Sequence, residues 1–197
     1  MSSLIGHALG GVVAAQTAAG KTIPAVRRRF YLVMALTSLL PDLDVLVFLL
    51  FKPLEITPHR GATHSLLFAA GIALVLTFAC ARFFALAKER LFGCLFAAYC
   101  SHPILDYLMG SGPEIPFLWP FYDRGFLSPV QLVPTAYYGL SSDAVIDVFL
   151  RWDTYAGVAL ELAIFVPLLF LPRAGNTSQR RDLLMLAVAG VAATALL

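Results

Sequence analysis

Charged residues are scarce in this chain: Asp, Glu, Lys and Arg make up 13% of its 197 residues, whereas hydrophobic residues make up 59%. Soluble globular domains are about a quarter charged and roughly half apolar, so this composition excludes an ordinary soluble domain. It also excludes a disordered chain, because disorder requires low hydrophobicity and high charge. The formal net charge of +2 is too small to indicate nucleic acid as a partner. A small membrane protein with several spans remains.

Cysteine is equally rare. The three cysteines, Cys80, Cys94 and Cys100, lie in apolar stretches and form neither a C-x-x-C pair nor an even set. This pattern indicates neither a disulfide framework nor a zinc ribbon, and buried, unreactive thiols are expected. The N-terminus lacks the basic region that is typical of a secretory signal, so we expect the first apolar helix to be retained.

Long apolar segments, by contrast, are abundant. A transmembrane helix needs about 20 mostly apolar residues. The small residues in the first and last of the segments suit close packing between helices. We therefore predict an all-α fold, in which residues 1–197 form a single transmembrane bundle of about six helices. The segments that meet or approach this length are 4–20, 30–51, 64–86, 91–109, 154–171 and 183–197.

Positive charges gather in alternate connections between these segments. With six spans, the basic connections 21–29, 87–90 and 172–182 fall on one side of the membrane, and the positive-inside rule assigns that side to the cytoplasm. The long connection 110–153 then lies outside, and we expect it to form a lid-like loop followed by a surface helix over 141–151. Ten of the fourteen Lys and Arg lie in or beside the basic connections: Lys21, Arg27, Arg28, Arg29, Arg82, Lys88, Arg90, Arg173, Arg180 and Arg181.

A few polar residues interrupt the apolar segments, and they carry the functional information. Ionisable groups inside a membrane span are costly, so each is a functional hypothesis by default. The second segment contains the motif PDLD, the fourth contains SHPILD, and HRGATHS opens the third. Glu161 in the fifth segment has no obvious partner. The other intramembrane or flanking polar residues are His7, Asp42, Asp44, His59, Arg60, His64, His102 and Asp106.

Simple depth arithmetic brings these residues to one level of the membrane. A helix rises about 1.5 Å per residue, so the aspartates of PDLD lie roughly 18–21 Å from the cytoplasmic entry of the second segment. The His and Asp of SHPILD lie roughly 17–23 Å along the fourth segment. The hydrocarbon core is about 30 Å thick, so both pairs fall in its outer half. His7 and His64 lie near the outer ends of the first and third segments.

The residue types favour a divalent metal. Imidazole and carboxylate ligands together suit Zn²⁺, Mn²⁺ or Fe²⁺. We expect one or two ions, with zinc first, because two ions about 3.5–4 Å apart can activate a water and stabilise a leaving oxygen. His102 and Asp106, four residues apart, share a helix face. The expected ligands are His7, Asp42, His64, His102 and Asp106.

Four further residues are assigned supporting roles. Asp44 and His59 are expected to act as a general base, to hold the ligands, or to be additional ligands. Arg60 beside a helix N-terminus suits a phosphate, although neutralising a nearby carboxylate is an equally weighted alternative. Trp119, in the long connection, is expected to anchor the protein at the membrane interface or to contact substrate.

The order of these motifs resembles the YdjM-like family of inner-membrane-associated proteins, which are described as metal-dependent hydrolases. The resemblance covers roughly residues 1–125 and implies a metal-dependent hydrolase. The family's polar positions match His7, Asp42, Asp44, His59, His64, His102 and Asp106.

A more distant similarity, in the order His, Asp, His and H-x-x-x-D, is to the zinc-dependent phospholipase C and S1/P1 nuclease superfamily, which is helical and cleaves phosphodiesters. It implies that Asp106 bridges two ions. This chain lacks that superfamily's N-terminal Trp ligand and its later His-rich motif, so the similarity supports at most a two-metal variant.

Together these observations predict a phosphoesterase-like hydrolase of the inner membrane. A metal-activated water would attack a lipid or lipid-linked substrate that enters from the bilayer, at a site facing the extracytoplasmic side. Two alternatives stay open. The first is an ion- or proton-coupled transporter that uses the Asp and His cluster. The second is a non-catalytic membrane partner protein whose cluster only holds the helices together.

Overall fold

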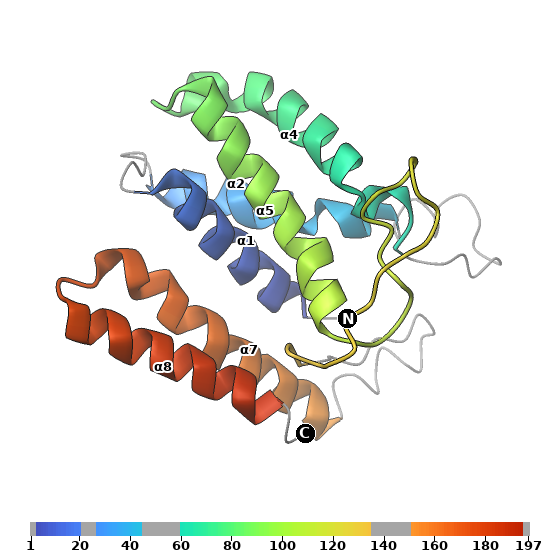
Figure 1. The fold of residues 1–197 in the computed structure, drawn as a ribbon. Helices are drawn as coiled ribbons and strands as arrows, with labels where there is room; N and C mark the ends of the chain where they lie inside the picture. The colour runs from blue at the N-terminus through green and yellow to red at the C-terminus, as the bar shows by residue number, and fades with distance from the viewer. Residues whose placement is uncertain (1–2, 21–26, 45–59, 135–150, 195–197) are drawn as a thin grey trace.

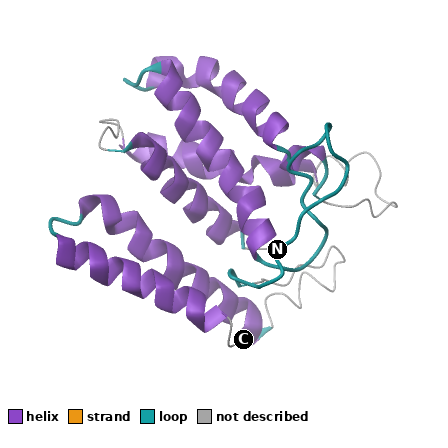
Figure 2. Cartoon of the chain, in the orientation of Figure 1, coloured by secondary structure: helices purple, strands orange, loops and turns teal. Residues whose placement is uncertain are grey.

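A computed structural model describes residues 3–20, 27–44, 60–134 and 151–194 (Figure 1). Within these ranges the chain is all-α, with one isolated β-bridge between Ile115 and Phe126 and no longer strand (Figure 2). The predicted all-α fold is therefore confirmed. The α-helices of the described residues are α1 Leu4–Ala19, α2 Arg27–Leu39, α4 Leu66–Cys80, α5 Lys88–Leu108, α7 Trp152–Phe170 and α8 Thr177–Thr194.

Helix α5 is the centre of the bundle. It packs against α1, α2 and α4, while α1 also contacts α2 and α7. Helices α7 and α8 form an antiparallel hairpin along the other side of α1 (Figure 1). The core between α1, α2 and α5 is built from fully buried residues such as Phe30, Met34, Leu91 and Leu95. Residues on α5 are therefore surrounded by three other helices.

Among the described residues, three helices are long and apolar enough to cross a membrane: Leu66–Phe83, Lys88–Leu108 and Trp152–Arg173. Only a small share of α4 and α7 is buried, and Val75 and Phe78 of α4 are 65% and 64% accessible. Apolar surface of this extent suits contact with lipid rather than water. These features agree with the predicted helical membrane bundle.

The other apolar segments fall short of this length for identifiable reasons. Helix α1 has 16 residues, below the number needed to span. The first turns of α8 carry Arg180, Arg181 and Asp182, which shortens its apolar part. Residues 45–51 of the second predicted segment, and residues 141–150 of the predicted surface helix, lie outside the described residues.

A 3₁₀ turn interrupts the helix inside the predicted segment 30–51. Helix α2 stops at Leu39, and Leu40–Asp42 form a 3₁₀ turn that begins with Pro41 at its second position. Proline removes a backbone donor and clashes with the preceding helical turn, which favours a break in the helix at this point. Leu43 and Asp44 are helical again, and α5 and α7 continue through Pro103 and Pro167. The turn changes the direction in which Asp42 and Asp44 are presented.

Two glycines bring α1 unusually close to its neighbours. A Cβ on Gly11 would lie 2.4 Å from Cβ of Ser38 on α2. A Cβ on Gly10 would lie 2.7 Å from Cδ1 of Leu105 on α5. Small residues permit this close approach of helix backbones. His7 precedes these glycines by one turn, so the tight packing fixes its position.

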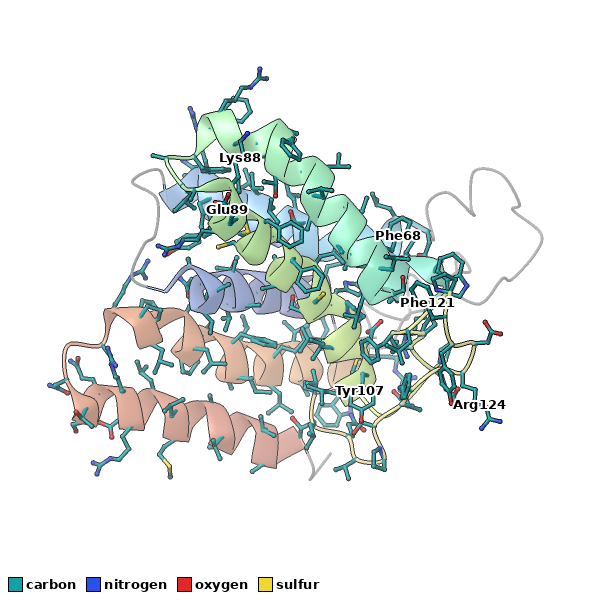
Figure 3. The ribbon with its side chains drawn as sticks, turned by 45° about the horizontal axis from the view of Figure 1, so that its top comes forward. Phe68, Lys88, Glu89, Tyr107, Phe121 and Arg124 are labelled. Atoms are coloured by element: carbon teal, nitrogen blue, oxygen red, sulfur yellow. The ribbon has the colours of Figure 1, made fainter. Side chains whose placement is uncertain are left out.

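The described part of the long connection, residues 110–134, folds back over the C-terminal end of α5. The amides of Ser128 and Leu132 donate to the carbonyls of Tyr107 and Leu108 at 3.2 and 2.8 Å. Aromatic side chains of this loop stay exposed, and Phe121 is 84% accessible (Figure 3). Exposed aromatic residues at a helix end suit the headgroup level of a bilayer.

Candidate metal centre

Polar residues from four separate elements meet at one point inside the bundle. His7 comes from α1, Asp42 from the 3₁₀ turn after α2, and His64 from a 3₁₀ turn, Ala62–His64. His102 and Asp106 come from adjacent turns of α5. The three histidines and Asp106 are completely buried, and the side chain of Asp42 is 15% exposed. The five expected ligands are therefore neighbours in space.

The side-chain nitrogen and oxygen atoms that face the centre lie at distances close to those between the ligand atoms of a metal site. Nε2 of His102 lies 3.0 Å from Oδ1 of Asp42 and 3.7 Å from Oδ2 of Asp106. Nε2 of His64 lies 3.9 and 3.7 Å from the same two oxygens. A tetrahedral zinc site with bonds of 2.0–2.2 Å has ligand atoms roughly 3.3–3.6 Å apart. The observed separations lie on either side of this range, so small side-chain movements, which lengthen the shortest separation and shorten the others, would accommodate an ion.

His7 extends this set on one side. Its Nε2 lies 3.5 Å from Oδ1 of Asp106, and its ring stacks on that of His102 with centroids 3.7 Å apart. The potential ligand atoms form two overlapping groups, one with His7, His102 and Asp106 and one with Asp42, His64 and His102. Within each group the atoms lie within 4.8 Å of one another. Asp106 presents one oxygen to His7 and the other to His64 and His102, as a bridging carboxylate would.

Several of these atoms make no hydrogen bond, although they are buried. Within the described part of the chain, both ring nitrogens of His7, Nε2 of His102 and both oxygens of Asp106 have no hydrogen-bond partner of normal geometry. Buried polar atoms without such partners are uncommon and costly. Nε2 of His7, Nε2 of His102 and the oxygens of Asp106 converge, and a cation among them would satisfy these inward-facing atoms in addition to Arg60 beside Asp106.

Hydrogen bonds behind the histidines set their orientation. Nδ1 of His102 lies 2.8 Å from the carbonyl oxygen of Ser38. Because a carbonyl only accepts, Nδ1 carries the proton of this hydrogen bond, and Nε2 is the nitrogen that faces the centre. The hydroxyl of Ser38 also donates to the carbonyl of His7 at 2.9 Å. Ser38 thus holds two of the expected ligands from the side of α2.

Thr63 plays the corresponding part for His64. Its Oγ1 donates to Oδ2 of Asp44 at 3.1 Å and lies 3.0 Å from Nδ1 of His64. A hydroxyl has one proton, so when it is given to a carboxylate, Nδ1 of His64 must be the donor. Nε2 of His64 then faces the centre without a proton. Tyr99 anchors the turn by donating to the carbonyl of Thr63 at 2.8 Å.

Arg60 lies beside Asp106 and ties the long loop to the site. Its Nε is 3.1 Å from Oδ2 of Asp106, and its Nη1 donates to the carbonyls of Ser111 and Pro113 at 2.9 and 2.8 Å. Its backbone φ of 80° lies in the left-handed region, which residues other than glycine rarely adopt. This arrangement matches the carboxylate-neutralising alternative, and it also fixes residues 111–113 next to the centre.

Comparison with known proteins identifies the family. The model of the YdjM inner membrane protein family matches residues 1–195. The chain belongs to this family. A relative, the inner membrane protein YbcI of Escherichia coli strain K12, is 32% identical over 142 residues, which cover 72% of this chain and 80% of YbcI. No solved structure matches. The resemblance drawn from the motifs is confirmed, whereas the similarity to the phospholipase C superfamily stays a prediction.

Two other predicted site residues of this YdjM-family chain, Asp44 and Trp119, lie apart from the inward-facing atoms. Oδ2 of Asp44 is 3.9 Å from Nδ1 of His64, so it contacts the outer side of that ring. Trp119 lies in the loop with its side chain 41% exposed, and no contact with the cluster is recorded for it among the described residues. His59 lies outside the described residues.

Three residues of the site were not predicted as functional. Ser38 and Tyr99 are neutral polar residues inside apolar helices, and Thr63 is a neutral polar residue of the HRGATHS motif. Ser65 caps α4, because its hydroxyl accepts from the amide of Phe68 at 3.2 Å. The available sequence signal for Ser38 is its position one helical turn before Asp42.

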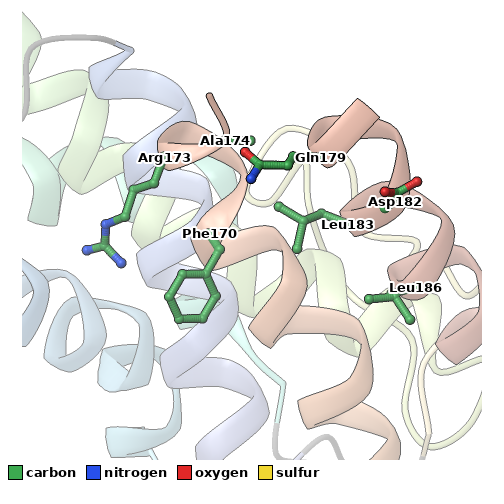
Figure 4. A pocket seen from close by; sticks show the side chains of 7 residues that line it. All are labelled: Phe170, Arg173, Ala174, Gln179, Asp182, Leu183 and Leu186. Carbon is green, nitrogen blue, oxygen red and sulfur yellow. The ribbon is translucent and has the colours of Figure 1, made fainter. Parts of the chain in front are cut away.

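An open pocket of about 320 Å³ lies elsewhere in this YdjM-family protein (Figure 4). It is lined by residues at the turn between α7 and α8, among them Phe170, Arg173, Gln179 and Leu183. This turn lies at the opposite end of the hairpin from the start of α1 (Figure 1). None of the converging histidines or aspartates lines the pocket, so the chemistry of the cluster is separate from it.

Proposed function

We propose that this protein is a membrane-embedded, metal-dependent hydrolase that acts on phosphoesters of lipids or lipid-linked molecules. The observation that carries the proposal is that buried atoms of His7, His102 and Asp106 without hydrogen bonds converge at one point. The carboxylate of Asp42 and the imidazole of His64 lie beside them. A cluster that only held helices together would be expected to pair its polar atoms with one another.

The five residues would hold one or two divalent ions, and their chemistry suits zinc, with manganese or iron as alternatives. A bound ion supplies Lewis acidity and brings the pKa of a water to about 7. Asp42 is the one partly exposed member of the set, so its side is where water and substrate would approach. The hydrogen bonds from Ser38 and Thr63 keep the imidazoles oriented and deprotonated toward the centre.

Arg60 and Asp44 supply charge next to these ligands. The guanidinium of Arg60 offsets the negative charge of Asp106 and would attract a phosphate group. Asp44, which accepts from Thr63, would stabilise the Nδ1 proton of His64 or act as a general base. Substrate contact by Trp119 and a catalytic role for His59 are retained as parts of the proposal.

A lipid substrate is favoured by the surroundings of the centre. Helices α4 and α7 expose apolar side chains along most of their length, and the loop that Arg60 fixes carries exposed aromatic residues. A substrate with an acyl or polyprenyl tail would keep the tail in the bilayer while its phosphate reaches the buried ligands. We propose that residues 110–134 cover the site during the reaction.

We propose that the site faces the extracytoplasmic side. Lys88 begins α5, and Tyr107, next to Asp106, is near the other end of that helix (Figure 3). The positive-inside rule assigns the Lys88 end to the cytoplasm. A protease added to intact spheroplasts should therefore cut within 110–134, and protection of that loop would contradict this orientation.

The decisive experiment measures metal content in detergent-purified protein by elemental mass spectrometry. Wild type is expected to hold at least one equivalent of a transition metal, and Asp106→Asn is expected to lose it. Asp123→Asn, which changes an exposed carboxylate of the loop, is the matched control and should retain the metal. Normal metal content in Asp106→Asn, or active protein without any transition metal, would overturn the proposal.

Activity is tested with the same three proteins on a phospholipid monoester, phosphatidic acid, and a diester, phosphatidylglycerol, in mixed micelles. Wild type and Asp123→Asn should release product from one of the two, and Asp106→Asn should not. Ion flux through liposomes that contain the protein, without hydrolysis of either lipid, would favour the transporter instead.

A further inference from the structure

A buried carboxylate lies outside the centre and has no part in the chemistry described above. Glu161 is near the middle of α7 and is completely buried, although α7 is one of the helices apolar enough to span a membrane. An acidic group in such a helix is costly and needs a compensating interaction. The groups that bind its carboxylate therefore indicate the role of Glu161.

Glu161 accepts from the first described residue of the chain. The amide of Ser3 donates to its Oε1 at 2.7 Å, and the hydroxyl of Ser3 donates to its Oε2. Ser3 is also the N-cap of α1, where its Oγ accepts from the amide of Gly6 at 3.0 Å. The carboxylate thus binds the N-terminus of a helix, where the helix dipole favours a negative charge.

The same residue begins the helical turn that carries His7. The amide of His7 donates to the carbonyl of Ser3 at 3.0 Å. On its other side, the carbonyl of His7 accepts from Ser38 of α2. The first turn of α1 is therefore held between Glu161 on α7 and Ser38 on α2, and a shift of Ser3 along the helix axis would move the His7 imidazole by a similar amount.

We propose that Glu161 is a positioning residue, which acts through Ser3 to set the imidazole of His7 within the cluster. The inference rests on the proposed metal centre for its consequence, since a displaced His7 would no longer lie beside Asp106. It assigns a role to the hairpin of α7 and α8, which contributes no ligand itself.

The first test measures zinc affinity by competition with a chromophoric chelator. Glu161→Leu and Ser3→Ala should each weaken binding by about 10–100-fold, the usual cost of losing a group that orients a ligand. Glu161→Gln should lose less zinc affinity than Glu161→Leu, because the glutamine amide oxygen can still accept a hydrogen bond from the amide of Ser3. Asp153→Asn, at the exposed start of α7, is the control and should bind as wild type does.

The decisive arm repeats Glu161→Leu in a His7→Ala background. If Glu161 acts through His7, removing it should cause no further loss of zinc affinity once the imidazole is gone. A purely structural role would weaken binding equally in both backgrounds. An equal loss would therefore overturn the inference, and so would full affinity in Glu161→Leu.

A second measurement does not depend on metal. Diethyl pyrocarbonate modifies accessible imidazoles, and mass spectrometry locates the modified residue. In metal-free protein, His7 should be protected in wild type and become reactive in Glu161→Leu and Ser3→Ala, while His102 stays protected. Continued protection of His7 would overturn the inference even if zinc binding fails.

The zinc-binding and diethyl pyrocarbonate measurements also distinguish the proposed function from the proposed role of Glu161. Absence of zinc binding in wild type defeats the proposed function, whereas the reactivity of His7 still decides the role of Glu161. Gel filtration in detergent identifies variants that do not fold. If Glu161→Leu is among them, Glu161→Gln and Ser3→Ala carry both measurements.

Discussion

Replacing Gly11 by alanine is expected to disturb the centre without touching any of its ligands. The added Cβ would lie 2.4 Å from Cβ of Ser38, 2.6 Å from its Oγ and 3.1 Å from the carbonyl oxygen of Met34. Ordinary van der Waals contact begins near 3.4 Å. A rotation of the Ser38 side chain does not relieve the clash, because its Cβ is fixed to the backbone of α2.

The helices must therefore separate by about 1 Å, and overpacking of this kind typically costs about 1–3 kcal/mol. His7 lies four residues before Gly11 on the same face of α1, and its carbonyl is bound by Ser38. Metal–ligand distances tolerate only about 0.2 Å of error. We expect Gly11→Ala to lower zinc affinity by about 10–100-fold, comparable to losing the support of a ligand.

The assay combines chelator competition with thermal unfolding followed by circular dichroism in detergent. Gly71→Ala is the matched control, since a Cβ at Gly71 of α4 meets nothing within 4 Å. It should keep full zinc affinity and change stability by at most about 1 kcal/mol, in the stabilising direction. Wild-type zinc affinity and stability in Gly11→Ala would refute the argument that α1 packing fixes His7.

Three further substitutions test the groups around the ligands. Thr63→Val removes the hydroxyl between Asp44 and His64, so zinc affinity should fall about 10–100-fold while Thr63→Ser keeps it, as measured by chelator competition. Tyr99→Phe removes one hydrogen bond and should lower thermal stability by about 1 kcal/mol while metal content stays unchanged. Arg60→Gln leaves the buried carboxylate of Asp106 without its guanidinium partner and should lower thermal stability by about 3–5 kcal/mol. The same variant should be cleaved faster by protease within 110–134. An unchanged cleavage rate would contradict the contact between Arg60 and that loop.

The helices were largely predictable from the sequence because apolar runs and basic connections mark them directly. The expected segment 91–109 corresponds to α5, Lys88–Leu108, and 154–171 corresponds to α7, Trp152–Phe170. Composition does not reveal where a helix stops inside an apolar run. Composition did not locate the 3₁₀ turn with Pro41, which interrupts the helix after Leu39 before Leu43 and Asp44 are helical again.

The clustering of the expected ligands could also be predicted from the sequence. Ionisable side chains are so rare in this chain that each one is informative, and depth along the helices brought them to one level. Ser38, Thr63 and Tyr99 escaped notice because hydroxyl groups are common in membrane helices and carry no such cost. The sequence showed Glu161 as an acidic residue inside an apolar segment. Its partner, Ser3, could not be predicted, because the contact depends on how α1 packs against α7, and the hydrophobic pattern does not determine that packing.

The geometry limits how the two overlapping ligand groups can be used. His102 belongs to both groups, but its Nδ1 is committed to the carbonyl of Ser38, so only Nε2 faces inward. One nitrogen lone pair binds one ion. Asp42 and Asp106 are both carboxylates that can contact two ions, and the two oxygens of Asp106 face His7 and the other histidines separately. If the protein holds a second ion, His7 and Asp106 are the residues that would hold it, and its binding would depend on the placement of α1 by Gly11, Ser38 and Glu161.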